Sequence, residues 1–162
     1  MSITVFGNRR SLVIDDNVEI LEDFRKVLVS DNTSSAIDEA GASLFGEVMK
    51  EAHDESFSVD FAEQGEAGLR LVEQAVGSGK PYALAFVDMR MPPGWDGVET
   101  ITRLWQVDPD VEIVICTAFS DHAWEDVVTT LGQRDKFLIL RKPFDAIEVH
   151  QLASSLARKW NL

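Results

Sequence analysis

The run Tyr82–Asp88 (YALAFVD), followed directly by Met89–Gly97 (MRMPPGWDG), decides the fold. Its almost wholly apolar residues predict a short strand buried on both faces, as in a parallel sheet, and the Pro- and Gly-containing residues after it predict a loop. In open α/β sheets, ligands bind at the carboxyl ends of the strands, which is where Asp88 stands. A lone Asp at a strand end more often bonds to its own turn, so a reactive role for Asp88 depends on the rest of the chain.

Four other apolar runs predict further strands, at Ser11–Ile14, Phe57–Phe61, Val111–Thr117 and Phe137–Leu140. The run Phe57–Phe61 alternates apolar and polar residues, which is typical of a half-exposed edge strand.

A helix is predicted after each strand from the spacing of the apolar residues. The five helices begin near Asn17, Ala67, Val98, Ser120 and Asp145, and the last is expected to point Ile147, Leu152 and Leu156 inward. Strand and helix therefore alternate five times, which predicts an α/β fold with a five-stranded parallel sheet, right-handed crossovers and helices on both faces. The flavodoxin-like strand order 2-1-3-4-5 is the expected topology.

Length and composition limit the function classes. At 162 residues, the chain is expected to form one domain over 11–162, with an N-terminal extension at 1–10 and an inserted or extended helical segment at about 30–55. The 15 Lys and Arg against 28 Asp and Glu give a formal net charge of −13, which argues against nonspecific binding to nucleic acid or anionic membranes. The single cysteine, Cys116, lies in an apolar run and fits a reducing compartment. No apolar run approaches the roughly 18 residues of a membrane span and no signal peptide is visible, so a cytoplasmic location is expected.

Charged and hydroxyl side chains stand at the ends of four predicted strands. In the order 2-1-3-4-5 these strands are neighbours, and they bring to one edge of the sheet Asp15, Asp16, Asp88, Thr117 and Lys142. Three carboxylates in one crevice repel one another unless a cation is present, and hard oxygen ligands suit Mg²⁺. A carboxylate beside Mg²⁺ can attack a phosphoryl group, whose charge an ammonium and a hydroxyl would stabilise. Each residue alone has an ordinary explanation, such as a helix cap or a solvated charge, and only their joint placement indicates a reactive site.

From about Ser11 to Lys159, the sequence resembles the receiver domains of two-component response regulators. Four pieces carry the resemblance: Leu12–Asn17 (LVIDDN), Val87–Pro92 (VDMRMP) with Asp96-Gly97, Thr117-Ala118, and Lys142–Phe144 (KPF). The resemblance implies that Asp88 accepts phosphate from the phosphohistidine of a sensor histidine kinase or a histidine phosphotransfer domain, and that the phosphate biases a conformational switch.

The resemblance also implies roles for the other site residues. The Mg²⁺ ligands would be Asp15, Asp16, Asp88 and the main-chain carbonyl of Arg90, while Thr117 and Lys142 would contact the phosphoryl group. The peptide bond between Lys142 and Pro143 would be cis, which costs little before a proline. An output domain in a longer chain and a homodimer are both compatible with the family.

Three features depart from the family pattern. The loop 91–97 contains one residue more than usual, and the segment 30–55 is longer than the usual connection. Ile139 occupies the position at which the family often carries a Tyr or Phe that moves inward on activation, so the usual switch lacks its aromatic side chain. The sequence of 136–149 resembles receivers linked to hybrid kinases or cyclic-dinucleotide enzymes.

Two other functions are compatible with parts of this sequence. A phosphatase that forms its own aspartyl-phosphate, such as the haloacid dehalogenase class, needs an acid two residues after the nucleophile. That position holds Arg90, so an enzyme with steady turnover is not expected. A phosphate-independent scaffold with the same fold is the main alternative, which Ile139 favours and the intact set of acids, Thr117 and Lys142 opposes. The negative charge gives no support to direct binding of DNA.

Overall fold

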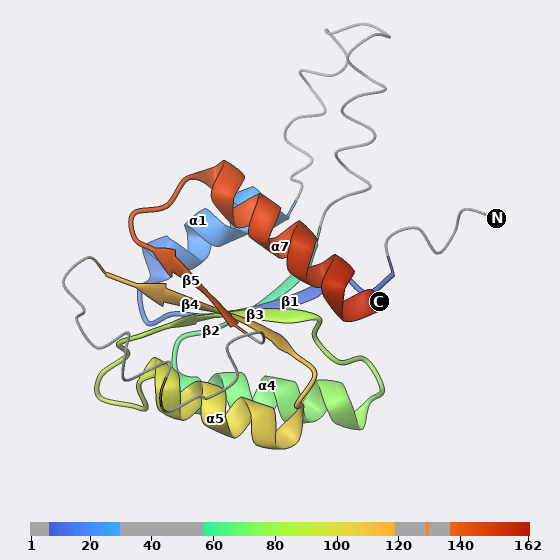
Figure 1. Ribbon diagram of the computed structural model, residues 1–162. Coiled ribbons are helices and arrows are strands. Elements are labelled where there is room, and N and C mark those ends of the chain that lie inside the picture. Colours follow the sequence, from blue (N-terminus) through green and yellow to red (C-terminus); the bar gives the residue numbers. More distant parts are fainter. Residues whose placement is uncertain (1–6, 30–56, 119–128, 130–136) are drawn as a thin grey trace, which may run out of the picture.

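The computed structural model describes residues 7–29, 57–118, 129 and 137–162. Its centre is one parallel sheet made of β1 (Arg10–Ile14), β2 (Ser58–Ala62), β3 (Leu84–Asp88), β4 (Glu112–Thr117) and β5 (Phe137–Arg141). The strand order is β2-β1-β3-β4-β5, which confirms the predicted topology (Figure 1). The predicted edge strand is also confirmed, because β2 pairs with β1 alone among the described strands and its side chains alternate in exposure.

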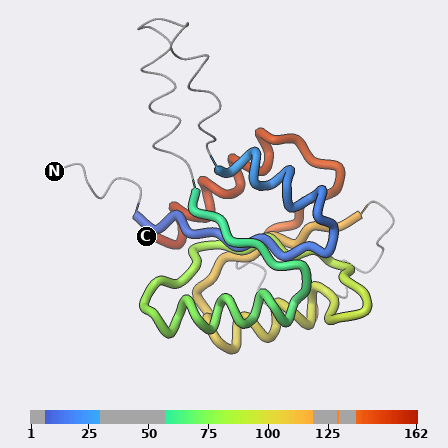
Figure 2. Tube along the Cα trace, turned by 180° about the vertical axis from the view of Figure 1, so that it is seen from behind, coloured from blue at the N-terminus to red at the C-terminus, as the bar shows by residue number. Residues whose placement is uncertain are grey.

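Four described helices cover the sheet, two on each face (Figures 1 and 2). One face carries α1 (Val18–Leu28) and α7 (Ala146–Asn161), and the other carries α4 (Gly65–Gly77) and α5 (Gly97–Val107). The segment expected as a helix over 120–131 lies outside the described residues except for Thr129, which is helical. The segment at about 30–55 also lies outside them. No helix in the described part of the chain is long and apolar enough to cross a membrane.

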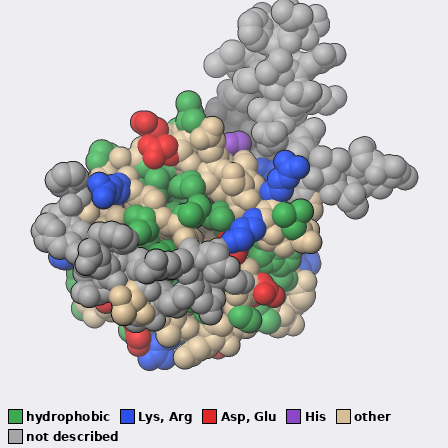
Figure 3. All heavy atoms as spheres, viewed as in Figure 1, with side chains coloured by type: hydrophobic (Ala, Val, Ile, Leu, Met, Phe, Trp, Pro, Cys, Tyr) green, Lys and Arg blue, Asp and Glu red, His purple; other side chains and the backbone are tan. Residues whose placement is uncertain are grey.

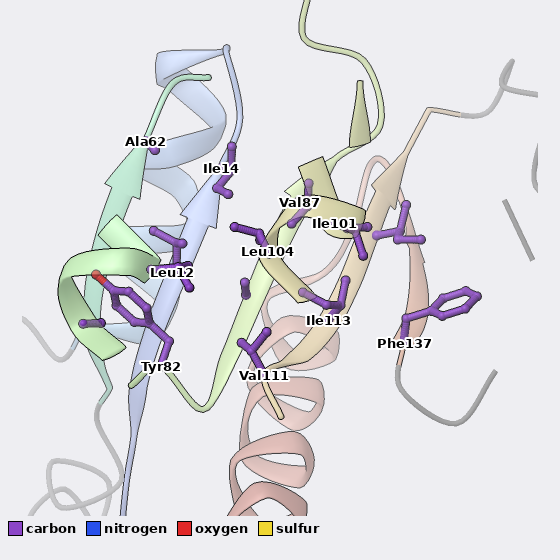
Figure 4. Close-up of a cluster of buried hydrophobic side chains, with 14 of the residues drawn as sticks. Leu12, Ile14, Ala62, Tyr82, Val87, Ile101, Leu104, Val111, Ile113 and Phe137 are labelled. Carbon is purple, nitrogen blue, oxygen red and sulfur yellow. The ribbon is translucent and has the colours of Figure 1, made fainter. Parts of the chain in front are cut away.

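The central strand has the burial that its sequence predicts. All five residues of β3 are buried, and those from Leu84 to Val87 have no exposed surface. Residues that alternate along β3 therefore contact two separate cores, one on each face of the sheet. Figure 4 shows the core on one face, where Leu12, Val87 and Ile113 from three strands pack with Ile101 and Leu104 of α5.

The prediction that Ile147 points inward is wrong. Ile147 is 71% exposed, whereas the buried face of α7 consists of Val149, Ala153, Leu156 and Ala157. At 100° per residue, the separation of nine positions between Ile147 and Leu156 places these two side chains on opposite sides of the helix. Ile147 instead lines a groove of about 530 Å³ between α1 and α7, together with Lys26 and Val27 of α1.

Residues just before β1 contact the end of the last helix. The main-chain N–H of Asn8 donates to Asn161 Oδ1 at 2.8 Å, and Asn161 Nδ2 donates back to the carbonyl oxygen of Asn8 at 2.9 Å. The side chain of Asn8 also donates to the carbonyl oxygen of Pro81, at 2.8 Å. Asn8 is therefore hydrogen-bonded to α7 and to Pro81, which precedes β3, although the sequence of 1–10 shows little pattern.

Charged side chains are dispersed over the face seen in Figure 3, where Lys and Arg stand apart from one another and acidic groups lie between them. A nucleic-acid-binding face usually carries a continuous basic stripe. The described part of this face therefore gives no support to such a function.

Candidate functional site

The parallel sheet places the predicted site residues at one edge, at the carboxyl ends of β1, β3, β4 and β5. Ile14 is the register partner of Val87, so the residues that follow them, Asp15 and Asp88, end neighbouring strands at the same level. Asp88 is in turn paired with Cys116, which precedes Thr117 at the end of β4. The alignment of the strands, and not a local motif, is what brings these side chains together.

Three carboxylates form a cluster at this edge. One carboxylate oxygen from each of Asp15, Asp16 and Asp88 lies within 4.8 Å of the others. Asp15 is 1% exposed and Asp88 is 7% exposed, while Asp16 is on the surface. An all-oxygen donor set that is partly open to water fits Mg²⁺, which keeps several of its waters when it binds to proteins.

Asn17 supports this cluster from the start of α1. Its main-chain N–H donates to Asp15 Oδ1 at 2.9 Å, and its side chain caps α1 by accepting from the N–H of Glu19. This residue was not among the predicted site residues, although an Asn directly before a helical pattern is a sequence signal for an N-cap.

Lys142 joins two of the carboxylates. Its Nζ atom lies 2.9 Å from Asp15 Oδ2 and 2.9 Å from Asp88 Oδ1. The main-chain N–H of Lys142 donates to the carbonyl oxygen of Thr117 at 2.8 Å, which extends the β4–β5 pairing to the site. Burial alone would lower the pKa of Lys142, but its hydrogen bonds to Asp88 and Asp15 outweigh this effect and raise the pKa. Lys142 is therefore a cation at neutral pH.

Asp88 has an unusual acidity for an aspartate. Burial is the main cause that raises its pKa to about 6, the hydrogen bond from Lys142 acts in the opposite direction, and the negative charge of Asp15 adds to the rise. Asp88 Oδ1 accepts from Lys142, whereas Oδ2 accepts no hydrogen bond from the described residues. The second oxygen is thus available to a metal ion or an electrophile.

Thr117 and Arg90 lie next to the site in the sequence. The hydroxyl of Thr117, at the end of β4, donates to the carbonyl oxygen of Ala118 at 3.1 Å. Within the described residues it makes no hydrogen bond to Asp88 or Lys142. Arg90 is exposed and stands two residues after Asp88. The role of its main-chain carbonyl as a metal ligand stays a prediction.

Comparison with known families identifies the chain. Residues 39–154 match the model of the response regulator receiver domain, and this span is more than half of the sequence. The chain belongs to the response regulator receiver family. The matched span of the receiver domain includes Asp88, Thr117 and Lys142, and it begins after Asp15 and Asp16.

Solved receiver domains share the fold at low sequence identity. A CheY-like receiver domain protein from Methanospirillum hungatei has a TM-score of 0.67 and 15% identity, and the match covers 96% of this chain and 98% of that one. A receiver protein from Sinorhizobium medicae has a TM-score of 0.66 and 20% identity, over 95% and 98% of the two chains. A structure described as adenylate cyclase from Rhodopirellula baltica has a TM-score of 0.66 and 21% identity, over 95% and 90%. A search of curated proteins found no match.

Two proline bonds near the site of this receiver domain are cis. The bond between Lys142 and Pro143 is cis, as the resemblance implies. The bond between Pro92 and Pro93 is also cis, which the sequence reasoning missed. The signal for it was the Pro-Pro pair inside the loop that is one residue longer than the family pattern.

The start of α5 lies directly against the end of β3. The N–H of Gly97 donates to the carbonyl oxygen of Met89 at 2.8 Å, and Asp96 caps the helix by accepting from the N–H of Glu99 at 2.8 Å. A Cβ atom at Gly97 would lie 2.8 Å from the carbonyl oxygen of Asp88 and 3.0 Å from Met89 Cα. Only glycine therefore allows this approach.

Gly97→Ala is expected to lower the free energy of unfolding by about 1–3 kcal/mol, because the added methyl group meets main-chain atoms that cannot turn away. Urea unfolding measures the change. Gly77→Ala is the matched control, since nothing lies within 4 Å of its Cβ position, and it should leave stability unchanged or raise it by less than about 1 kcal/mol. Equal losses in both variants would contradict the role of close packing at Gly97.

Proposed function

We propose that this receiver domain is a phosphoacceptor of two-component signalling, in which Asp88 receives a phosphoryl group from the phosphohistidine of a sensor histidine kinase or a histidine phosphotransfer domain. The observation that carries the proposal is the geometry of Lys142, whose Nζ atom bridges Asp15 and Asp88 at 2.9 Å each beside the three-carboxylate cluster. A purely structural lysine would be expected to pair on the exposed surface instead, at lower desolvation cost.

The chain's own residues can perform the transfer. Asp88 in its ionised form attacks phosphorus through a carboxylate oxygen, the bond between phosphorus and the histidine nitrogen breaks, and an aspartyl-phosphate forms. Lys142, already within hydrogen-bond distance of Asp88, is placed to neutralise charge on the transferred group. A bound Mg²⁺ would add positive charge next to the phosphoryl oxygens. Asp15 and Asp16 are the residues that would hold it together with Asp88.

The domain is proposed as a signalling module and not as an enzyme with steady turnover. A phosphatase of the aspartyl-phosphate type needs a second acid two residues after the nucleophile, and Arg90 at that position cannot donate or accept the proton. At most, the domain would phosphorylate and dephosphorylate itself at Asp88.

Partners and location follow from the same proposal. The buried free thiol of Cys116 fits a reducing, cytoplasmic environment. An output domain in a longer chain and a homodimer both stay proposals. One solved neighbour, from Rhodopirellula baltica, is described as an adenylate cyclase.

A scaffold that signals without phosphate is the second candidate, and Ile139 is the observation that favours it. Ile139 stands on β5 at the position where an aromatic side chain usually responds to phosphorylation, and it is 38% exposed.

The deciding experiment adds beryllium fluoride and Mg²⁺, which together mimic a phosphorylated carboxylate, and records amide NMR shifts for the wild type and Asp88→Asn. The proposal predicts shifts around Asp88 and Lys142 in the wild type only, extending to β5 if the switch works without its aromatic residue. Shifts confined to the site would indicate a receiver that passes phosphate on without moving its surface. No shifts in the wild type would favour the scaffold.

Mg²⁺ affinity is expected to weaken as the pH falls through about 6, because the pKa of Asp88 in the metal-free protein is raised to about 6 and a protonated carboxyl is a poor ligand. Titration calorimetry at pH 7.5 and pH 5 should show a loss of about tenfold. An affinity that stays constant down to pH 5 would mean that Asp88 is not a ligand.

A further inference from the structure

Three aromatic rings connect the segments that carry the site residues. The ring of Phe24 on α1 lies 4.8 Å from the ring of Phe86 on β3 and 4.9 Å from the ring of Phe144, which follows β5. Both pairs are tilted, at 48° and 47°, an arrangement that favours contact between ring edges and faces. Phe24 is 1% exposed and Phe86 is completely buried, so the centre of this aromatic chain is rigid core.

Each outer ring is two residues away from a site residue. Phe86 precedes Asp88 by two positions on one strand, so their side chains leave the same face of the sheet. Phe144 follows Lys142 by two positions. The aromatic chain Phe86–Phe24–Phe144 therefore links the backbone that carries the acceptor to the backbone that carries its lysine, by way of α1.

Lys142 needs this support because of its place in the sheet. It leaves β5, which lies at the edge of the described sheet, and its side chain must pass the end of β4 to reach Asp88 on β3. The hydrogen bond from the main-chain N–H of Lys142 to the carbonyl oxygen of Thr117 fixes only where the strand ends. The direction of the chain over 142–144 then decides where the Nζ atom lies, since a lysine side chain has many rotamers of similar energy.

We propose that Phe144 is a positioning residue for the phosphoacceptor site: by packing on Phe24, it holds the Lys142 ammonium between Asp15 and Asp88. The inference rests on the proposed function for its effect on phosphoryl transfer, but the position of Lys142 can be measured without any phosphate. Phe24 provides the fixed surface, because α1 begins directly after Asp15, Asp16 and Asn17 and so moves together with the acids.

The test compares three variants of the full chain. Phe144→Ala removes the ring of a half-buried residue and leaves the buried rings of Phe24 and Phe86 in place, so the domain is expected to fold. Phe144→Tyr keeps the ring and adds a hydroxyl that can reach solvent. Leu152→Ala is the matched control, since Leu152 is a half-buried side chain of the same core that takes no part in the aromatic chain.

Two measurements distinguish a displaced Lys142 ammonium from a general loss of stability. The first is the ¹H–¹⁵N NMR signal of the Lys142 ammonium, which is sharp when its hydrogens are held by Asp15 and Asp88 and is lost when they exchange with water. The second is the rate of phosphorylation by acetyl phosphate at saturating Mg²⁺ and saturating donor. We expect Phe144→Ala to lose the ammonium signal and to slow the saturated rate by about tenfold, because small misplacements of a charged group are costly to catalysis.

Phe144→Tyr should retain the ammonium signal and a phosphorylation rate within about twofold of the wild type. Leu152→Ala should retain the signal and the rate while it loses about as much stability as Phe144→Ala. Loss of the signal in Leu152→Ala to the same degree, or an intact signal in Phe144→Ala, would overturn the inference. If the wild type is not phosphorylated at all, the proposed function fails, whereas the ammonium signal still decides the positioning role.

Discussion

Asp88→Asn is expected to abolish incorporation of phosphate from acetyl phosphate in the presence of Mg²⁺, because an amide is not a nucleophile toward phosphorus. Mass spectrometry under non-acidic conditions measures the added phosphoryl group. Asp96→Asn is the matched control: Asp96 is an exposed acid of the same loop, and Asn caps a helix about as well as Asp. Asp96→Asn should therefore accept phosphate like the wild type. Equal labelling of Asp88→Asn would contradict the assignment of the acceptor.

Asp88→Asn is also expected to stabilise the metal-free protein at neutral pH. The pKa of Asp88 is raised from 3.8 to about 6, so between these values the folded state binds a proton that the unfolded state has lost. The contribution of this group to stability therefore falls as the pH rises from about 4 to about 6 and is lowest above that range. Replacing the buried charge should raise the free energy of unfolding at pH 7 by an amount on the order of 1–3 kcal/mol.

The pH dependence separates this effect from simple repacking. For the metal-free wild type, the free energy of unfolding measured with denaturant should decline between pH 4 and pH 7. Asp88→Asn should lack most of this decline. A variant that is less stable than the wild type at pH 7 would mean that the ion pair with Lys142 outweighs the cost of burying the carboxylate.

Lys142→Met is expected to have the second largest effect. It leaves the carboxylates of Asp15 and Asp88 buried without the ammonium that now contacts both at 2.9 Å. Phosphorylation by acetyl phosphate should slow by about 10²–10³-fold, the usual cost of removing one group that stabilises charge in a transition state. Metal-free stability at pH 7 should fall by about 1–3 kcal/mol, because a buried charge has lost its partner.

Mg²⁺ should restore more stability to Lys142→Met than to the wild type, since the metal becomes the sole countercharge in the cluster. Thermal unfolding with and without Mg²⁺ measures this difference. Lys80→Met, at an exposed lysine before β3, is the control and should behave as the wild type does. A Lys142→Met protein that is phosphorylated at the wild-type rate would remove Lys142 from the mechanism.

The sequence predicts the strand order and the alignment of the site residues at the carboxyl ends of the strands. A wholly apolar run that ends on Asp88 can be read directly as a central parallel strand, and five alternations of strand and helix then imply the order that aligns Asp15, Asp88 and Lys142. These predictions depend on continuous or alternating apolar runs and on sheet topology, which are insensitive to the exact packing of side chains.

What the sequence could not predict depends on packing between segments. The apolar residues of α7 fit more than one helical face as the buried one, and the face that includes Ile147 is the wrong choice. Contact with the sheet selects the face that carries Val149 and Ala153. The contact of Phe144 with Phe24 joins residues that are 120 positions apart, so no local pattern announces it. The raised pKa of Asp88 likewise arises from burial by distant segments.

Chemical trapping of the acyl phosphate identifies the residue that accepts the phosphoryl group. After phosphorylation with acetyl phosphate and Mg²⁺, borohydride reduces an aspartyl-phosphate to homoserine, and peptide mass spectrometry locates the reduced residue. If Asp88 is the acceptor, homoserine is expected at position 88 alone, and none is expected when Mg²⁺ is omitted. Reduction at position 15 or 16, or phosphate retained on a serine, threonine or histidine with position 88 unchanged, would contradict it.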